Sequence, residues 1–348
     1  MAKTFFLTQS TALSLVIVIC LIFLSFGIYY SKNYRGLKNY LTANRNIGFL
    51  SLTTSLTASA LGAWILFGPA SAATWGGLGA IIGYSLGTAF PMFFFIYLGK
   101  KIRKEFPQGS TLIEFLRKKF GKSLFKLILL MTIFYMFIFL CAEVTAVAVL
   151  INYISGTELW LTALIVLLCT LTYTLYGGLK ASILTDKIQM FVIGFLLLIS
   201  LIYILSFTGT KFSFDFVKEK NSHLLSGSYL PGYTSGLTFF IAVAATNLFH
   251  QGNWQRIYAA KDYKTLKKSL ILSFLIIVPV VFFMGFTGLV AFSLNSSIRP
   301  DLGFFYLLLN EQAIFLSIVV IILGLALTIS TVDTLINAIS SLIIVDGK

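Results

Sequence analysis

The feature that most constrains this chain is a series of long apolar stretches. A helix needs about 20 mostly apolar residues to cross the hydrocarbon core of a membrane. Nine stretches of about that length each predict a membrane-spanning helix. They lie at 10–30, 47–72, 76–99, 127–151, 159–176, 188–208, 236–256, 269–293 and 312–344.

The composition excludes a water-soluble fold. Of the 348 residues, 58% are hydrophobic and 11% are charged, whereas a soluble domain has roughly 25% charged residues. A chain of this length cannot bury so much apolar surface away from water. We therefore predict an all-α integral membrane protein, with nine transmembrane helices in a single membrane domain over residues 1–348.

The net charge of +14 fits the same prediction. If the N-terminus lies outside, the segments that face inside hold 21 of the 26 Lys and Arg residues, as the positive-inside rule requires. This predicts a multi-pass protein of the cell (inner) membrane with a cytoplasmic C-terminus. The charge then reflects topology and needs no nucleic-acid partner. The basic stretch from Lys100 to Lys122 could also contact anionic lipid.

The sequence offers little for catalysis. The three cysteines, Cys20, Cys141 and Cys169, lie inside apolar stretches, and the two histidines, His223 and His250, form no cluster with them. No P-loop, GxSxG, HExxH or CxxC motif is present. We therefore predict that the protein is not an enzyme and needs no cofactor. Without an ATP site, any active transport would depend on an ion gradient.

Three carboxyl groups lie in or at the end of predicted spans. They are Glu143, Asp186 and Asp333, and buried acidic residues of membrane proteins are usually functional. Asp333 belongs to a polar stripe at helical spacing, which consists of Ser330, Thr331, Asp333, Thr334, Asn337, Ser340 and Ser341. Such a stripe could line a site for a hard cation, because hard cations prefer oxygen ligands. It could equally stabilise helix packing through hydroxyl groups.

Two predicted spans contain residues that interrupt helices. The stretch 47–72 includes Gly62, Gly68 and Pro69, and the stretch 236–256 includes Gly252 among polar residues. Transporters use broken helices to present backbone groups at the membrane midplane, although a simple kink would leave the same pattern. The two spans are five apart, as the first helices of two five-helix repeats would be.

Several motifs resemble the sodium:solute symporter family. They are YTLYGGLKASILTDKIQ at 173–189, FHQGNWQRIYAAKD at 249–262, STVDTLINAISSLIIVD at 330–346 and LTASALGAWILFGPA at 56–70. Within the family, FPQGSTLIEFLRKKFG at 106–121 looks most similar to the urea-transporter branch. The resemblance implies a core of ten helices in a 5+5 inverted repeat, preceded by one extra helix. It also implies inward, sodium-coupled symport of a small polar solute by alternating access.

The nine spans cover only part of that core. The extra helix matches 10–30, the first five-helix repeat matches 47–208, and 236–344 matches the first three helices of the second repeat. The resemblance therefore implies an incomplete core and a C-terminally truncated symporter. The alternatives are a non-functional fragment and the membrane portion of a sensor with a symporter-like fold.

The resemblance also implies sites for sodium as the coupling ion. The first would use backbone carbonyl groups of Ala58, Leu61 and Leu327 with the hydroxyl groups of Ser330 and Thr331. A second site, or a route for sodium release, would use Asp186, Ser330, Asp333 and Thr334. Two carboxylates there would either strengthen the site or leave one of them protonated, because close anions repel.

The implied substrate cavity lies between the second, third and seventh spans. Its matching residues are Ala60, Gly62, Trp64, Ile65, Tyr84, Phe249, His250, Gln251 and Trp254. Because no Lys or Arg is expected in this cavity, the predicted solute is small and neutral or planar, such as urea, an amide or a nucleobase-like compound. His250 and Gln251 could alternatively serve only to satisfy the backbone of a broken helix.

Overall fold

The computed structural model describes residues 5–32, 36–309 and 314–347, and these residues form helices without a named strand. An isolated bridge pairs Ile47 with Ala260. The start of the ninth predicted span, at 312, lies outside the described residues, as do Lys3, Arg35 and Lys348 of the charge count.

Ten helical elements begin before residue 160. They are α1 (Gln9–Ser31), α2 (Leu37–Thr42), η1 (Ala43–Arg45), α3 (Phe49–Ala60), η2 (Ala63–Leu66), α4 (Gly68–Ala89), α5 (Pro91–Glu105), α6 (Leu112–Phe120), α7 (Lys122–Ser155) and α8 (Leu159–Thr208) in the described part of the chain. The rest follow as η3 (Gly209–Lys211), α9 (Phe214–Leu225), α10 (Leu230–Phe249), α11 (Gln251–Ala259), α12 (Tyr263–Leu294), η4 (Pro300–Leu302), α13 (Gly303–Leu308) and α14 (Ile314–Asp346).

Seven helical segments in the described residues are long and apolar enough to cross a membrane, compared with nine predicted spans. The difference has two causes. The predicted span 47–72 is divided between α3, η2 and the start of α4, so it contains no long uninterrupted helix. The predicted spans 159–176 and 188–208 both lie in α8, which is counted once. Nine crossings therefore stay a prediction.

The chain turns sharply within two of the long helices. The 50 residues of α8 would extend about 75 Å as a straight helix, more than twice the hydrocarbon thickness of a bilayer. At Gly178 the backbone instead adopts φ 58° and ψ −155°, and at Gly77 in α4 it adopts φ 58° and ψ −152°. Glycine suits both positions because residues with a Cβ rarely adopt positive φ.

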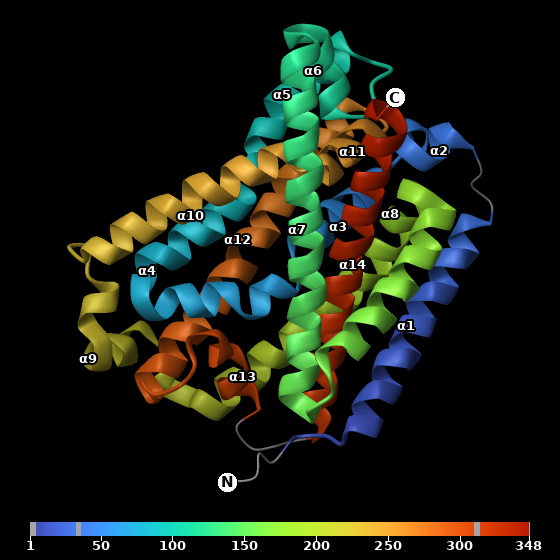
Figure 1. Ribbon diagram of the computed structural model, residues 1–348. Coiled ribbons are helices and arrows are strands. Elements are labelled where there is room, and N and C mark those ends of the chain that lie inside the picture. The colour runs from blue at the N-terminus through green and yellow to red at the C-terminus, as the bar shows by residue number, and fades with distance from the viewer. Residues whose placement is uncertain (1–4, 33–35, 310–313, 348) are drawn as a thin grey trace.

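Helix α14 is the central element of the bundle. It packs against α3, α7, α8 and α11, and Figure 1 shows it running between α7 and α8. Except for the half-buried Ser340, the polar stripe that begins at Ser330 is buried, and so are Val332 and Leu335 on the other face. A helix whose middle part is buried all round lies inside the bundle rather than at its edge.

Helices α4 and α10 pack with their backbones almost in contact. A Cβ atom placed on Gly83 of α4 would lie 2.0 Å from the carbonyl oxygen of Gly236 in α10. One turn earlier, a Cβ atom on Gly79 would lie 2.3 Å from the carbonyl oxygen of Gly232. Small residues at such a spacing allow close helix approach in membranes, where dispersion between helices replaces the hydrophobic effect.

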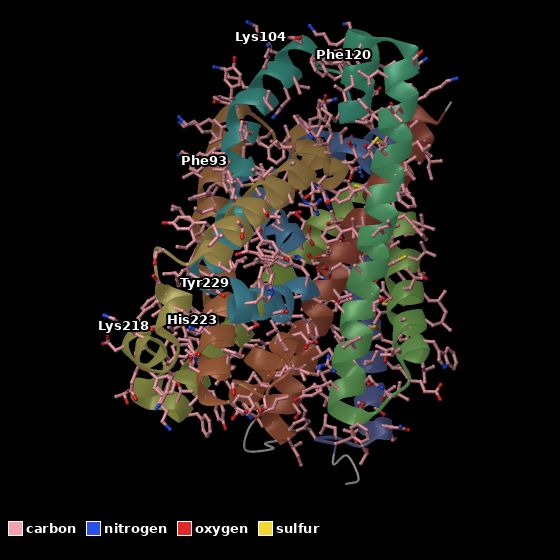
Figure 2. All side chains as sticks on the ribbon, turned by 60° about the vertical axis from the view of Figure 1, so that its left-hand side comes forward. Phe93, Lys104, Phe120, Lys218, His223 and Tyr229 are labelled. Carbon is pink, nitrogen blue, oxygen red and sulfur yellow. The ribbon has the colours of Figure 1, made fainter. Side chains whose placement is uncertain are left out.

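Figure 2 shows which residues lie at the two ends of the bundle. Lys104 and Phe120 lie at one end, and Lys218 and His223 lie toward the other. At the first end, Thr111 and Glu114 form a capping box at the start of α6. The outer sides of α1, α7 and α8 carry large exposed apolar side chains, which suit a lipid environment.

We expect Gly83→Ala to destabilise the protein by about 1–3 kcal/mol, because the added methyl group has no space beside Gly236. Thermal unfolding of the purified protein in detergent would measure this change. Gly194→Ala in α8 is a matched control, since a Cβ atom there would meet no neighbour within 4 Å. The control should gain about 0.5–1 kcal/mol from the better helix former. Equal shifts in the two variants would contradict the packing of α4 on α10.

Candidate functional site

A break in the helical backbone lies at the centre of the site. Helix α3 ends at Ala60, and the backbone of Gly62 is extended, with φ −86° and ψ 179°. A short turn, η2, follows before α4 begins at Gly68, with Pro69 in its first turn. Such a break inside a membrane leaves peptide groups that other parts of the protein must satisfy.

Glu143 of α7 supplies one of these partners. Its Oε2 accepts a hydrogen bond of 2.8 Å from the backbone N–H of Ala63. A Cβ atom on Gly62 would lie only 2.4 Å from Oε1 of Glu143, so the carboxylate fills the space where a side chain would stand. Glu143 is 1% exposed. The absence of a side chain at Gly62 therefore lets α7 reach the break.

A second break separates α10 from α11 at His250, whose backbone is extended with φ −69° and ψ 105°. Side chains from α11 satisfy the carbonyl groups at the end of α10. The indole N–H of Trp254 donates to the carbonyl of Leu248 at 2.7 Å, and the Asn253 amide donates to the carbonyl of Asn247 at 3.2 Å. The two breaks occur in the two stretches that contain the helix-interrupting residues.

A fully buried ion pair lies between the broken helices and α8. The Arg256 guanidinium of α11 donates from Nη2 to Oδ2 of Asp186 at 2.9 Å, and both side chains are 0% exposed. The same guanidinium donates from Nε to the Ser55 hydroxyl at 2.7 Å and from Nη2 to the Thr334 hydroxyl at 2.7 Å. The Ser330 hydroxyl donates to Oδ1 of Asp186 at 2.8 Å. The pair thus connects α3, α8, α11 and α14.

Asp333 belongs to a separate polar cluster. Its Oδ2 accepts a hydrogen bond of 2.7 Å from the Tyr173 hydroxyl, and its Oδ1 accepts one of 2.8 Å from the Ser182 hydroxyl. The Thr185 hydroxyl is 3.3 Å from Oδ2. These three partners belong to α8. The four residues of the implied second sodium site are therefore divided between the Arg256 network and the Asp333 cluster, with Thr334 also 3.4 Å from Asp333.

The residues of the implied first sodium site are buried where α3 and η2 meet α14. The Thr331 hydroxyl donates to the Leu327 carbonyl at 3.1 Å, so these two ligands lie side by side on α14. The carbonyl of Ala58 accepts from the N–H of Leu61 at 3.2 Å. The fold thus places the implied ligands on two elements that pack against each other.

A cavity of about 220 Å³ lies between α3, α4, α7 and α10. Three residues of the implied substrate site line it, namely Ala60, Trp64 and Tyr84. The rings of Trp64 and Tyr84 stack with centroids 5.3 Å apart, and Phe239 stacks on Tyr84 at 4.6 Å. Phe139 of α7 also lines the cavity. An aromatic wall of this kind is typical of small-molecule sites.

The other residues of the implied substrate site lie away from the cavity lining. Ile65 is buried in the core, and Phe249 lines a separate apolar groove between α7 and α10. The Gln251 amide bonds to the backbone of Leu112 and Ser110. Trp254 caps α10, as described above, and His250 contacts the ring of Phe139 from behind the cavity wall. Gln251 thus satisfies backbone groups at the start of α6, and Trp254 satisfies one at the second break.

The sequence patterns missed the role of Arg256. The charge count placed it with the basic residues of the inner surface, but the structure buries it against Asp186. A signal was available, since Arg256 lies at the end of the predicted span 236–256 and a buried arginine requires an anionic partner. The hydroxyl groups of Ser55 and Tyr173 gave no comparable signal, because their spacing alone does not show which helix they face.

A bundle of long apolar helices with two broken ones defines a multi-pass membrane protein of the transporter type. The family model described as "SSF: Sodium:solute symporter family" matches residues 40–346. The chain therefore belongs to the sodium:solute symporter family, whose members are transporters and not enzymes. Family membership and the apolar helices confirm the predicted multi-pass membrane protein.

Two transporters from other organisms are similar in sequence over much of the chain. A spermidine transporter of Candida albicans is 27% identical over 92% of this chain and 61% of its own length. A sodium/glucose cotransporter of Vibrio parahaemolyticus is 25% identical over 79% of this chain and 54% of its own length. The chain thus spans less than two thirds of the length of these relatives.

Among solved structures, a Na⁺-coupled sialic acid symporter, in a substrate-bound outward-open state, has a similar fold. The TM-score is 0.79 over 95% of this chain and 72% of that chain, at 17% sequence identity. At this identity the comparison shows the fold alone. It supports the predicted all-α membrane transporter architecture.

We expect Arg256→Gln and Asp186→Asn each to destabilise the protein by about 3–5 kcal/mol, because each leaves the other group buried without its partner. The double variant should recover part of the loss. Thermal unfolding of the four proteins as a double-mutant cycle would measure the coupling. Arg299→Gln is the control, since Arg299 pairs with Asp301 at an exposed site and its loss should change stability by about 0–1 kcal/mol. An additive cycle would contradict a direct Arg256–Asp186 interaction.

Proposed function

We propose that this chain forms the solute- and sodium-binding part of a sodium-coupled symporter, which imports a small polar solute by alternating access. The observation that carries the proposal is the break after α3, which lies against the polar residues of α14 and beside a solute-sized cavity. Family membership and the similar fold of a sodium-coupled symporter support sodium as the coupling ion.

In this proposal, sodium binds between α3 and α14. Its ligands are the carbonyl oxygens of Ala58, Leu61 and Leu327 and the hydroxyl oxygens of Ser330 and Thr331. A small hard cation is well suited to such a set, because five oxygen dipoles can replace its hydration shell without a full protein charge. Thr331 would exchange its hydrogen bond to Leu327 for a contact with the ion.

We give the two carboxyl groups of the implied second sodium site, Asp186 and Asp333, different roles. Arg256 neutralises Asp186, so a second sodium would have to compete with the guanidinium for Asp186, Ser330 and Thr334. Asp333 is held by hydroxyl groups of α8 and carries the charge that a second cation or a proton could neutralise. We propose that these groups mark the route by which sodium leaves toward the cytoplasm.

The cavity sets the size of the solute. Its volume of about 220 Å³ is below the roughly 300–1,000 Å³ of sites for drug-sized ligands, so the solute is small. The relatives carry the names of spermidine and glucose transporters, so the family does not fix the substrate. Thr88, Tyr135 and Asn247 also line the cavity beside the aromatic wall.

The proposed placement in the cell (inner) membrane puts the N-terminus outside and the C-terminus in the cytoplasm.

We expect Ser330→Ala and Thr331→Ala to raise the sodium concentration for half-maximal binding roughly tenfold or more, since each removes one ligand oxygen worth about 1.5–3 kcal/mol. Binding of ²²Na⁺ to the purified protein, with K⁺ holding the ionic strength constant, measures this concentration. Sodium-dependent solute uptake into vesicles is the functional counterpart.

Thr328→Ala is the control for these two variants. Thr328 is equally buried on α14, and its hydroxyl has no hydrogen-bond partner among the described residues. Its removal should leave the sodium affinity unchanged. If Ser330→Ala and Thr331→Ala bind sodium as the wild type does, the proposed site is wrong.

A further inference from the structure

Two helices, α3 and α10, end beside the cavity at the α3 break. Ser59 and Ala60, at the C-terminal end of α3, lie on one side of its lining, and Thr246 and Asn247, near the C-terminal end of α10, lie on another. The C-terminal end of a helix carries roughly half a negative charge from its carbonyl groups. No Lys or Arg is among the described residues of the lining. The cavity therefore favours positive charge.

The carboxyl group of Glu143 lies next to this lining, against Gly62. It lies one helical turn after Phe139 on α7, so both side chains point to the same face, and Phe139 lines the cavity. The carboxylate touches Gly62, which has no side chain and lies between the lining residues Ala60 and Trp64.

One oxygen of this carboxylate is not used by the fold. Oε2 accepts the hydrogen bond from Ala63, but Oε1 has no hydrogen-bond partner among the described residues. The four ion pairs between described residues do not include Glu143 either. A buried carboxylate without a cation is strongly unfavourable, so the group either binds a proton or pairs with a cationic donor. The fold therefore holds an acceptor that a cationic donor can satisfy.

The aromatic wall suits the same kind of donor. Trp64, Tyr84 and Phe239 form a continuous stack, with interplanar angles of 13° and 29°. Faces and edges of such rings hold apolar methylene groups, and their faces also attract ammonium groups. A solute with a cationic nitrogen and a short apolar part matches both the carboxylate and the stack.

We propose that the cavity selects a small organic cation, whose ammonium group pairs with Oε1 of Glu143 and whose carbon chain lies on Trp64 and Tyr84. The proposal rests on the proposed symport function and names its substrate class. It replaces the neutral solute that the sequence motifs predicted, because those motifs did not place Glu143 at the break. Glu143 is then the residue that distinguishes a cation from a neutral solute.

Two probes of equal length, one cationic and one neutral, test this selection. Butane-1,4-diamine carries ammonium groups at neutral pH, and butane-1,4-diol carries hydroxyl groups in their place. With saturating sodium, the diamine should raise the unfolding temperature of the purified 348-residue chain, and the diol should not. Equal effects of the two probes, or an effect of the diol alone, would overturn the proposal.

Glu143→Gln is the decisive variant. A Gln side chain keeps an oxygen that can accept from Ala63, but it removes the charge. We expect the diamine affinity to fall roughly tenfold or more and the response to sodium to persist. Glu219→Gln is the control, since Glu219 is an exposed residue paired with Lys220. An unchanged diamine affinity in Glu143→Gln would overturn the proposal.

A measurement on the wild type covers the case in which Glu143→Gln does not fold. A hydrophobic carbodiimide labels buried carboxyl groups, and mass spectrometry of the peptide that contains Glu143 reports its rate of labelling. The diamine should slow this rate at Glu143, whereas the diol should leave it unchanged. Equal rates with and without the diamine would contradict the proposal. Loss of the sodium response in the wild type would count against the symport function itself, so the two failures are distinguishable.

Discussion

A helix that is broken inside a membrane must find new partners for its peptide groups, and this requirement organises the rest of the structure. At the α3 break the partner is the Glu143 carboxylate, which can approach only because Gly62 has no side chain. At the α10 break the partners are Asn253 and Trp254. In hydrocarbon each unsatisfied group is expensive, so the neighbouring helices have to be placed to supply these bonds. The position of α7 follows from the first break, and the entry of α11 follows from the second.

The second break also places a charged side chain, that of Arg256, in the interior of the bundle. Arg256 enters the bundle on the short helix after the second break and meets Asp186 from α8. Ser55 and Thr334 complete the environment of this pair, so one guanidinium holds together four helices that are distant in sequence. A buried ion pair of this kind contributes more to the specificity of the arrangement than to stability, because the desolvation of both groups offsets their attraction.

Much of the fold could be predicted from local patterns, whereas the site needed contacts between distant segments. Apolar stretches predicted the helices, and Gly62 and Gly252 marked the breaks within two residues. Three residues of the implied substrate site line the cavity, since Ala60, Trp64 and Tyr84 lie on helices next to the first break. The patterns did not place the sharp turn at Gly178, which lies in α8 between the predicted spans 159–176 and 188–208. They also could not separate Asp333 from Asp186, since the direction of each carboxyl depends on partners from α8 and α11.

The contact between α4 and α10 has a mechanical consequence. Where Gly79 and Gly83 meet Gly232 and Gly236, no side chain separates the two backbones, so neither helix can slide past the other without a direct clash. The two helices therefore behave as one rigid plate. The cavity lies between this plate, α3 and α7, and it can change its width only if α3 or α7 moves relative to the plate. The carboxyl group of Glu143 connects α7 to the α3 break, so a movement of α3 relative to α7 would change this contact directly.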